Sequence, residues 1–121
     1  MKAIGMAVAF VGLCASACNT MAEGFTKAGE LHQLIQAHAR IAAGTSRQPE
    51  DYQDAALAVG YIEGIVDVLA KRSICPTSEM TVAQVVAITD GYLTAHPEEW
   101  DKPAAPEVFT ALSGVFPCGK R

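Results

Sequence analysis

Residues 81–97 carry the clearest helix signals of the chain and read Thr81-Val82-Ala83-Gln84-Val85-Val86-Ala87-Ile88-Thr89-Asp90-Gly91-Tyr92-Leu93-Thr94-Ala95-His96-Pro97. It opens with a capping box, because the Thr81 hydroxyl can accept from the Gln84 amide while the Gln84 side chain reaches back. It stops before Pro97, which cannot continue a helix. We predict a helix with an inward stripe at helical spacing: Val82, Val85, Val86, Thr89 and Leu93, widened by Ile88 and Tyr92.

Residues 28–43 form the first predicted helix. One face of it carries Leu31, Leu34, Ile35, His38 and Ile41 or Ala42 at helical spacing. Gly44 is a typical C-terminal stop. His38 lies on this stripe, where a hydrogen-bonded core or interface histidine is expected.

The second predicted helix begins at Pro49 and includes Lys71 and Arg72 in its last turn. Acidic residues at its start and basic residues at its end suit the helix dipole. Its apolar positions wrap most of the circumference, so we expect it at the centre of the fold. These positions are Leu57, Val59, Ile62, Ile65, Val66 and Leu69.

Gly60 and Gly64 sit four residues apart inside this helix, although each costs up to roughly 1 kcal/mol of helix propensity relative to Ala. We therefore expect another helix to pack closely against them. A membrane dimerisation motif is disfavoured by the charged residues of the same helix. Asp67 and Lys71 have the spacing of an ion pair. A catalytic acid–base pair formed by Glu63 and Asp67 is the weaker alternative, since no companion motif supports catalysis.

A fourth helix is predicted to start between Pro103 and Pro106, and Pro106 suits its first turn. Its buried stripe comprises Val108, Phe109, Leu112 and Phe116. With 121 residues, half of them apolar, the chain suits one small domain. The predicted fold class is all-α, a compact bundle of about four helices with one disulfide.

The first 22 residues are predicted to be a signal peptide, because Lys2 precedes an uncharged apolar run, residues 3–13, that is too short to span a bilayer. Small residues allow cleavage after Ala17 or Ala22, and we favour Ala22. Residues 23–121 would then form the mature domain. The alternative is a lipoprotein with its lipid anchor at Cys18.

Cleavage after Ala22 leaves Cys75 and Cys118, an even number that suits one disulfide in an oxidising compartment. Closing a loop of roughly 43 residues would constrain the unfolded chain by about 4 kcal/mol in the entropic model. The alternative, a catalytic thiol, needs a nearby base, and neither cysteine has a His close in sequence.

The formal charge of −4 argues against nucleic-acid binding, which needs clustered basic residues. An acidic surface suits a basic protein partner as well as plain solubility. His32, His38 and His96 have no metal-ligand spacing, and residues 23–121 contain no C-x-x-C. We therefore expect neither a metal nor another cofactor.

Five ordered motifs carry a family resemblance: residues 60–67 (GYIEGIVD), 74–76 (ICP), 81–86 (TVAQVV), 92–98 (YLTAHPE) and 111–118 (ALSGVFPC). This series resembles the Rap/Tai family, immunity proteins that neutralise peptidoglycan amidases delivered by type VI secretion. The resemblance implies a periplasmic inhibitor that blocks the active-site cleft of an amidase effector. It also implies a homodimer without enzymatic activity.

One departure from the family pattern is visible. Many relatives carry a further cysteine pair where this chain has Ile35 and Ala58. Its loss implies that the first helix docks by apolar packing alone.

For the partner-binding surface we nominate the segment between the last two helices, because it is acidic and holds the only Trp, a residue type enriched at interface centres. Its residues are His96, Glu98, Glu99, Trp100 and Asp101, with Pro97 and Lys102 among them. The alternative is that Trp100 merely closes the end of the bundle. Two other classes of function stay open: a small periplasmic chaperone or acid-stress binding protein, and a small envelope enzyme.

Overall fold

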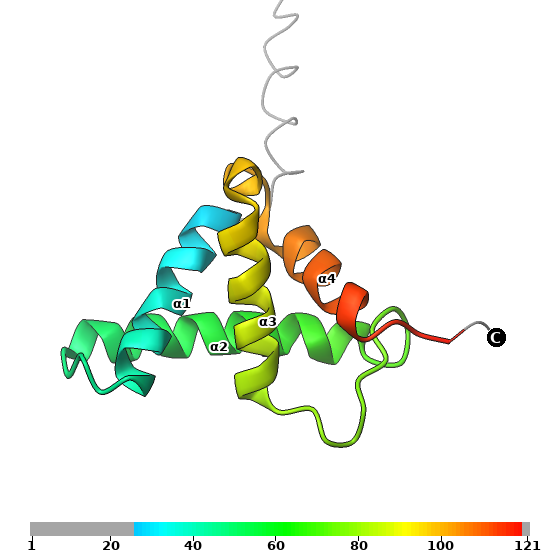
Figure 1. Cartoon of the computed structure of the whole chain (residues 1–121), viewed down its shortest axis with the longest axis horizontal. Coiled ribbons are helices and arrows are strands. Elements are labelled where there is room, and N and C mark those ends of the chain that lie inside the picture. Colours follow the sequence, from blue (N-terminus) through cyan, green and yellow to red (C-terminus); the bar gives the residue numbers. More distant parts are fainter. Residues whose placement is uncertain (1–25, 120–121) are drawn as a thin grey trace, which may run out of the picture.

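The computed structural model describes residues 26–119. Within them it contains four α-helices and one 3₁₀ turn: α1 (Ala28–Ala42), α2 (Pro49–Leu69), α3 (Val82–Ala95), η1 (Pro97–Glu99) and α4 (Ala104–Val115). Helix α2 lies along the base in Figure 1, α3 crosses it, and η1 lies at the far end of α3. The predicted all-α class is confirmed.

The helix ends follow the local signals in the sequence. At α3 the Gln84 amide donates to Thr81 Oγ1 at 3.3 Å, and the Thr81 amide donates to Gln84 Oε1 at 2.9 Å. Gly44 follows α1 with φ of 69°, a left-handed conformation in which Gly has no steric penalty. Helix α4 starts between the two prolines that were expected to bracket its beginning.

The core draws on every α-helix and on one loop residue. Its largest fully buried side chains are Leu31, Ile35, Ile62, Ile74, Leu93, Leu112, Val108 and Thr89. Each large aliphatic side chain contributes about 1.5–3 kcal/mol when it leaves water. The Thr89 hydroxyl donates to the Val85 carbonyl at 2.8 Å, so its burial leaves no polar group unpaired.

The expectation that α2 occupies the centre of the fold is wrong. Only Ala55, Ala58 and Ile62 of this helix are buried, whereas Leu57 and Val68 are 61% and 67% exposed. A Cβ atom at Gly60 or Gly64 would meet nothing within 4 Å, so no helix among residues 26–119 packs on the glycine pair. Helix α2 instead supports the other helices with one face and leaves the opposite face open.

Helix α2 also ends earlier than predicted. Ala70 leaves the helical conformation and Lys71 has φ of 62°, so Lys71 and Arg72 lie in a turn beyond the helix. The Lys71 amide donates to the Ile74 carbonyl at 2.8 Å, and this turn brings the fully buried Ile74 back into the core. The predicted ion pair between Asp67 and Lys71 is absent from the salt bridges of residues 26–119, because it required a longer helix.

Two predicted core residues are exposed instead. Val82 is the first residue of α3, and Phe109 lies on the outer side of α4. The other members of both stripes are buried or half-buried. On α4, Glu107 is buried, and its carboxylate accepts a hydrogen bond from the Tyr92 hydroxyl at 3.0 Å.

Helix α1 docks by more than apolar packing, contrary to expectation. Ile35 and Ala58 are indeed both buried in the core where α1 meets α2. In addition, Arg40 donates to both carboxylate oxygens of Asp51, with Nε 3.1 Å from Oδ2, and Gln36 donates to Asp90 Oδ1 at 2.7 Å. Polar contacts with both neighbouring helices therefore add to the apolar packing that docks α1.

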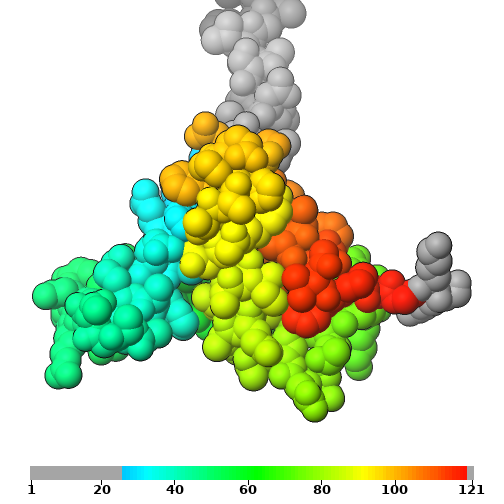
Figure 2. All heavy atoms as spheres, viewed as in Figure 1, coloured from blue at the N-terminus to red at the C-terminus, as the bar shows by residue number. Residues whose placement is uncertain are grey.

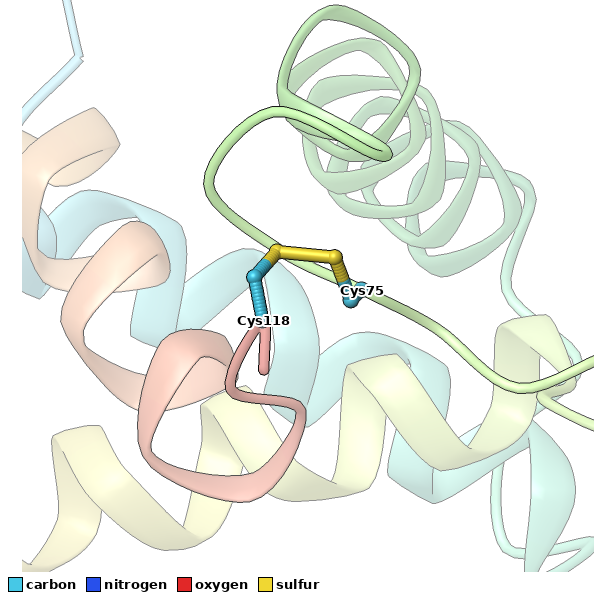
Figure 3. Close-up of a disulfide and its surroundings, with 2 residues drawn as sticks. All are labelled: Cys75 and Cys118. Atoms are coloured by element: carbon cyan, nitrogen blue, oxygen red, sulfur yellow. A yellow bond between two sulfur atoms is a disulfide. The ribbon is translucent and has the colours of Figure 1, made fainter. Parts of the chain in front are cut away.

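The structure joins Cys75 and Cys118, which confirms the predicted disulfide (Figure 3). Their Cα atoms are 4.9 Å apart, within the range a disulfide needs. The Cys75 amide also donates to the Phe116 carbonyl at 3.0 Å. Bridge and hydrogen bond together hold the end of α4 against the loop that follows α2.

None of the helices described by the structure has both the length and the apolar run that crossing a bilayer requires. The predicted signal peptide and the alternative lipid anchor at Cys18 lie outside the described residues.

Candidate functional site

The segment nominated from the sequence forms a corner between α3 and α4, which we call the 96–102 corner. Its backbone is tied to the start of α1: the Ala28 amide donates to the Lys102 carbonyl at 2.9 Å, and the Gly29 amide donates to the Trp100 carbonyl at 3.0 Å. Next to the corner, the Ala104 amide donates to the Thr26 carbonyl at 2.9 Å. These hydrogen bonds tie the corner to the start of α1 at one end of the bundle (Figure 2).

Trp100 is the structural centre of the corner. Its indole Nε1 donates to the Leu93 carbonyl at 2.9 Å, and its ring lies 4.8 Å from the His32 ring, centroid to centroid. A Cβ at Gly29 would come within 3.1 Å of Trp100 Cβ, so the glycine permits this close approach. The half-buried Trp100 therefore packs against the end of the bundle. This geometry fits the alternative stated from the sequence, in which Trp100 closes the end of the bundle.

Most charged side chains of the corner project outward, whereas Glu99 is half-buried. The side chains of Glu98 and Lys102 are 61% and 58% exposed, and Asp101 is exposed as well. Glu98 Oε1 lies 2.9 Å from His96 Nδ1, and this hydrogen bond lowers the pKa of Glu98. Glu99 pairs with Lys102 and raises the pKa of that lysine. The corner thus presents a mainly acidic surface on a fixed backbone.

The polar contacts of Tyr92 and His32 beside the corner were not predicted from the sequence. Tyr92 lies 4.4 Å from His96, ring to ring, and burial followed by the Glu107 hydrogen bond raises the pKa of the Tyr92 phenol. His32 Nδ1 lies 3.3 Å from Asp90 Oδ1. The Tyr92–Glu107 and His32–Asp90 contacts join residues of different helices, so helical spacing alone gave no signal for them.

The remaining candidates from the sequence lie apart from the corner. Glu63 and Asp67 border a hollow of about 270 Å³ at the start of α3, whose wall is otherwise mainly apolar. His38 and Asp90 line a smaller hollow of about 140 Å³ between α1 and α3. Residues 26–119 contain no group of three or more His, Cys, Asp or Glu side chains that could hold a metal ion.

Fold and corner together define a small, disulfide-closed helical protein with an acidic end that is hydrogen-bonded to the start of α1. The chain belongs to the Rap1a immunity protein family, because the family model described as Rap1a immunity proteins matches residues 17–118. This match confirms the resemblance drawn from the five sequence motifs. No curated protein matches the chain.

Proposed function

We propose that the protein is a periplasmic immunity protein that binds a peptidoglycan amidase delivered by type VI secretion and blocks its active-site cleft. The observation that carries this proposal is the family match over residues 17–118. Inhibition of this kind requires a stable complex and no turnover, so the protein acts without enzymatic activity. It acts as a homodimer, which is the common form of soluble oligomers.

The 96–102 corner is the part of the molecule that enters the cleft. A loop that is already ordered loses little conformational freedom on binding, which favours affinity. The backbone hydrogen bonds to Ala28 and Gly29 supply that order here, and Trp100 holds the corner from within. Trp100 thus has a positioning role and offers its remaining surface to the effector.

The charge of the corner favours an amidase with a basic rim. Glu98 and Asp101 are exposed carboxylates, and opposite charges at an interface speed encounter and select partners. The His96 hydrogen bond keeps Glu98 ionised at lower pH than an isolated glutamate. Affinity should therefore fall as salt is added.

Periplasmic co-expression with candidate amidases tests the proposal, with lysis and binding as readouts. The wild-type protein should prevent lysis by its own effector. The double variant Glu98→Lys and Asp101→Lys should bind at least about tenfold more weakly, a loss of about 1.4 kcal/mol. Glu79→Lys, an exposed charge reversal in the loop before α3, is the matched control and should bind normally.

Two results would contradict these proposals separately. Failure to protect against every amidase offered would remove the proposed effector class. Full protection by the double variant would be consistent with the proposed effector class, but it would show that the 96–102 corner is not the surface that binds the effector.

The signal peptide has its own test. Protein purified from the periplasm should begin at Glu23, immediately after the proposed cleavage site at Ala22. A lipid-modified N-terminus at Cys18 would establish the lipoprotein form instead.

A further inference from the structure

A hydrogen bond between two side chains joins α3 to α4 beside the 96–102 corner. The Tyr92 hydroxyl donates to Glu107 Oε2 at 3.0 Å, and only 8% of Glu107 is exposed. A carboxylate that leaves water loses its hydration, so it is tolerated where hydrogen bonds and favourable charge replace the water. Tyr92 supplies the hydrogen bond here, and the first turn of α4, in which Glu107 lies, favours a negative charge. Glu107 therefore anchors the hydroxyl end of Tyr92.

The ring of Tyr92 contacts the first residue of the corner, His96. The two ring centroids are 4.4 Å apart and the ring planes are inclined by 36°, which is an ordinary geometry for an aromatic pair. His96 lies just beyond the last residue of α3, so the helix itself does not fix its side chain. The Tyr92 ring therefore sets the position of the His96 imidazole.

His96 in turn holds Glu98, an exposed carboxylate of the corner. His96 Nδ1 lies 2.9 Å from Glu98 Oε1, and Nδ1 is the donor because an ionised carboxylate only accepts hydrogen bonds. The Glu98 side chain is 61% exposed. A glutamate without such a partner has many rotamers, and it loses that freedom when it binds a second protein. The hydrogen bond from His96 orders Glu98 before binding.

We infer that Tyr92 is a positioning residue for effector binding, which acts through His96 on the Glu98 carboxylate. The group that Glu98 receives is the cationic end of a Lys or Arg side chain of the effector. A carboxylate has about four acceptor positions, so the bond to His96 leaves others free for a cation. This inference rests on the proposed function and deepens it, because it identifies what orients the acidic surface of the corner and which chemical group that surface binds.

The charged groups around these contacts are mainly acidic. They are Glu98, Glu99, Lys102 and Glu107. The hydrogen bond from His96 is the main cause that lowers the pKa of Glu98 below its ordinary value of 4.5, and the charge of Lys102 is the smallest of the causes that lower it. The pKa of Glu98 therefore reports whether His96 is held in place.

The first measurement is an NMR titration of the Glu98 side-chain carboxyl, without effector. Tyr92→Leu removes the ring, and Tyr52→Leu, which changes an exposed tyrosine of α2, is the matched control. The pKa of Glu98 should lie below 4.5 in wild type and in Tyr52→Leu, and it should rise toward 4.5 in Tyr92→Leu. Tyr92→Phe keeps the ring and loses only the bond to Glu107, so it should give part of that rise. Circular dichroism should show the same helicity in all variants.

The second measurement is the affinity for a purified amidase effector that the wild-type protein inhibits. Tyr92→Leu should bind about three- to tenfold more weakly at pH 7, because Glu98 is no longer ordered before binding. A carboxylate with the higher pKa takes up its proton at higher pH. On acidification the affinity of Tyr92→Leu should therefore fall before that of wild type and of Tyr52→Leu.

An unchanged pKa of Glu98 in Tyr92→Leu would overturn the inference. So would effector binding by Tyr92→Leu as tight as that of wild type. If Tyr92→Leu loses helicity, Tyr92→Phe decides in its place, and a wild-type pKa of Glu98 in that variant would overturn the inference. A wild-type protein that binds no amidase effector contradicts the proposed function and the effector contact with it, whereas the titration still decides whether Tyr92 positions Glu98.

Discussion

Trp100 donates its indole N–H to the carbonyl oxygen of Leu93, seven residues earlier, at 2.9 Å. The last carbonyl groups of a helix lack partners within it, and at the end of α3 the Leu93 carbonyl accepts from both the Trp100 indole and the His96 amide. The same ring covers Gly29 and His32 at the start of α1. One side chain therefore joins two helix ends and fixes the corner between α3 and α4.

Replacing Trp100 should separate its two contributions. Trp100→Phe keeps a ring but loses the hydrogen bond, and we expect a cost of about 1 kcal/mol in the free energy of unfolding. Trp100→Ala also removes the packing and should cost roughly 2–3 kcal/mol, below the range for a fully buried aromatic side chain. Urea unfolding measures both. Equal stability of wild type and Trp100→Ala would show that the ring does not close the bundle.

The disulfide should provide a large part of the stability. The double variant Cys75→Ser and Cys118→Ser releases a loop with a sequence separation of 43 residues. The expected loss is about 4 kcal/mol, which corresponds to a fall in Tm of roughly 15–30 °C for a domain of this size. Calorimetry of oxidised protein and of the double variant measures it. Two free thiols in oxidised protein would contradict the bridge itself.

Asp51 should make stability depend on pH in the acid range. The Arg40 hydrogen bond, and after it the Ser46 hydrogen bond, lowers the pKa of Asp51 to about 2. Because the pKa is lower in the folded state, the contribution of this carboxylate is complete above the ordinary value of 3.8 and is lost as pH falls through about 2.

Asp51→Asn should therefore lower Tm at pH 7, and its difference from wild type should shrink between pH 4 and pH 2 as the wild-type carboxylate of pKa about 2 takes up its proton. Asp67→Asn, which removes an exposed carboxylate of the same helix, is measured alongside as the control for the loss of one negative charge from α2. If the difference in Tm between Asp51→Asn and wild type stayed constant across this pH range, the ion pair of Asp51 with Arg40 would not be the cause of that difference.

The capping box of α3 should be worth about 1 kcal/mol. Thr81→Ala removes the acceptor for the Gln84 amide, which lies 3.3 Å from the Thr81 hydroxyl. Thr94→Ala, an exposed position near the other end of α3, is the matched control and should be within about 0.5 kcal/mol of wild type. Chemical denaturation of both variants decides whether the predicted cap stabilises the helix.

Sequence reasoning succeeded where the physics is local. The Thr81 cap, the Gly44 stop and the start of α4 between two prolines each depend on a few adjacent residues. The disulfide followed from counting cysteines after removal of the predicted signal peptide.

The failures depended on partners far away in the chain. The end of α2 is set by Ile74, which enters a core built from all four helices. The exposure of α2 could not be read from its composition either, because an apolar helix surface looks the same whether it faces the core or a second molecule. At the corner, the contact of Trp100 with His32 joins residues far apart in sequence.

The most direct test of the central claim is the hydrolysis of peptidoglycan by a purified amidase effector, measured with increasing amounts of this protein. We expect stoichiometric inhibition by the oxidised wild-type protein and inhibition at least about tenfold weaker for Glu98→Lys with Asp101→Lys. Undiminished hydrolysis by every amidase effector, at protein concentrations well above that of the enzyme, would contradict the account.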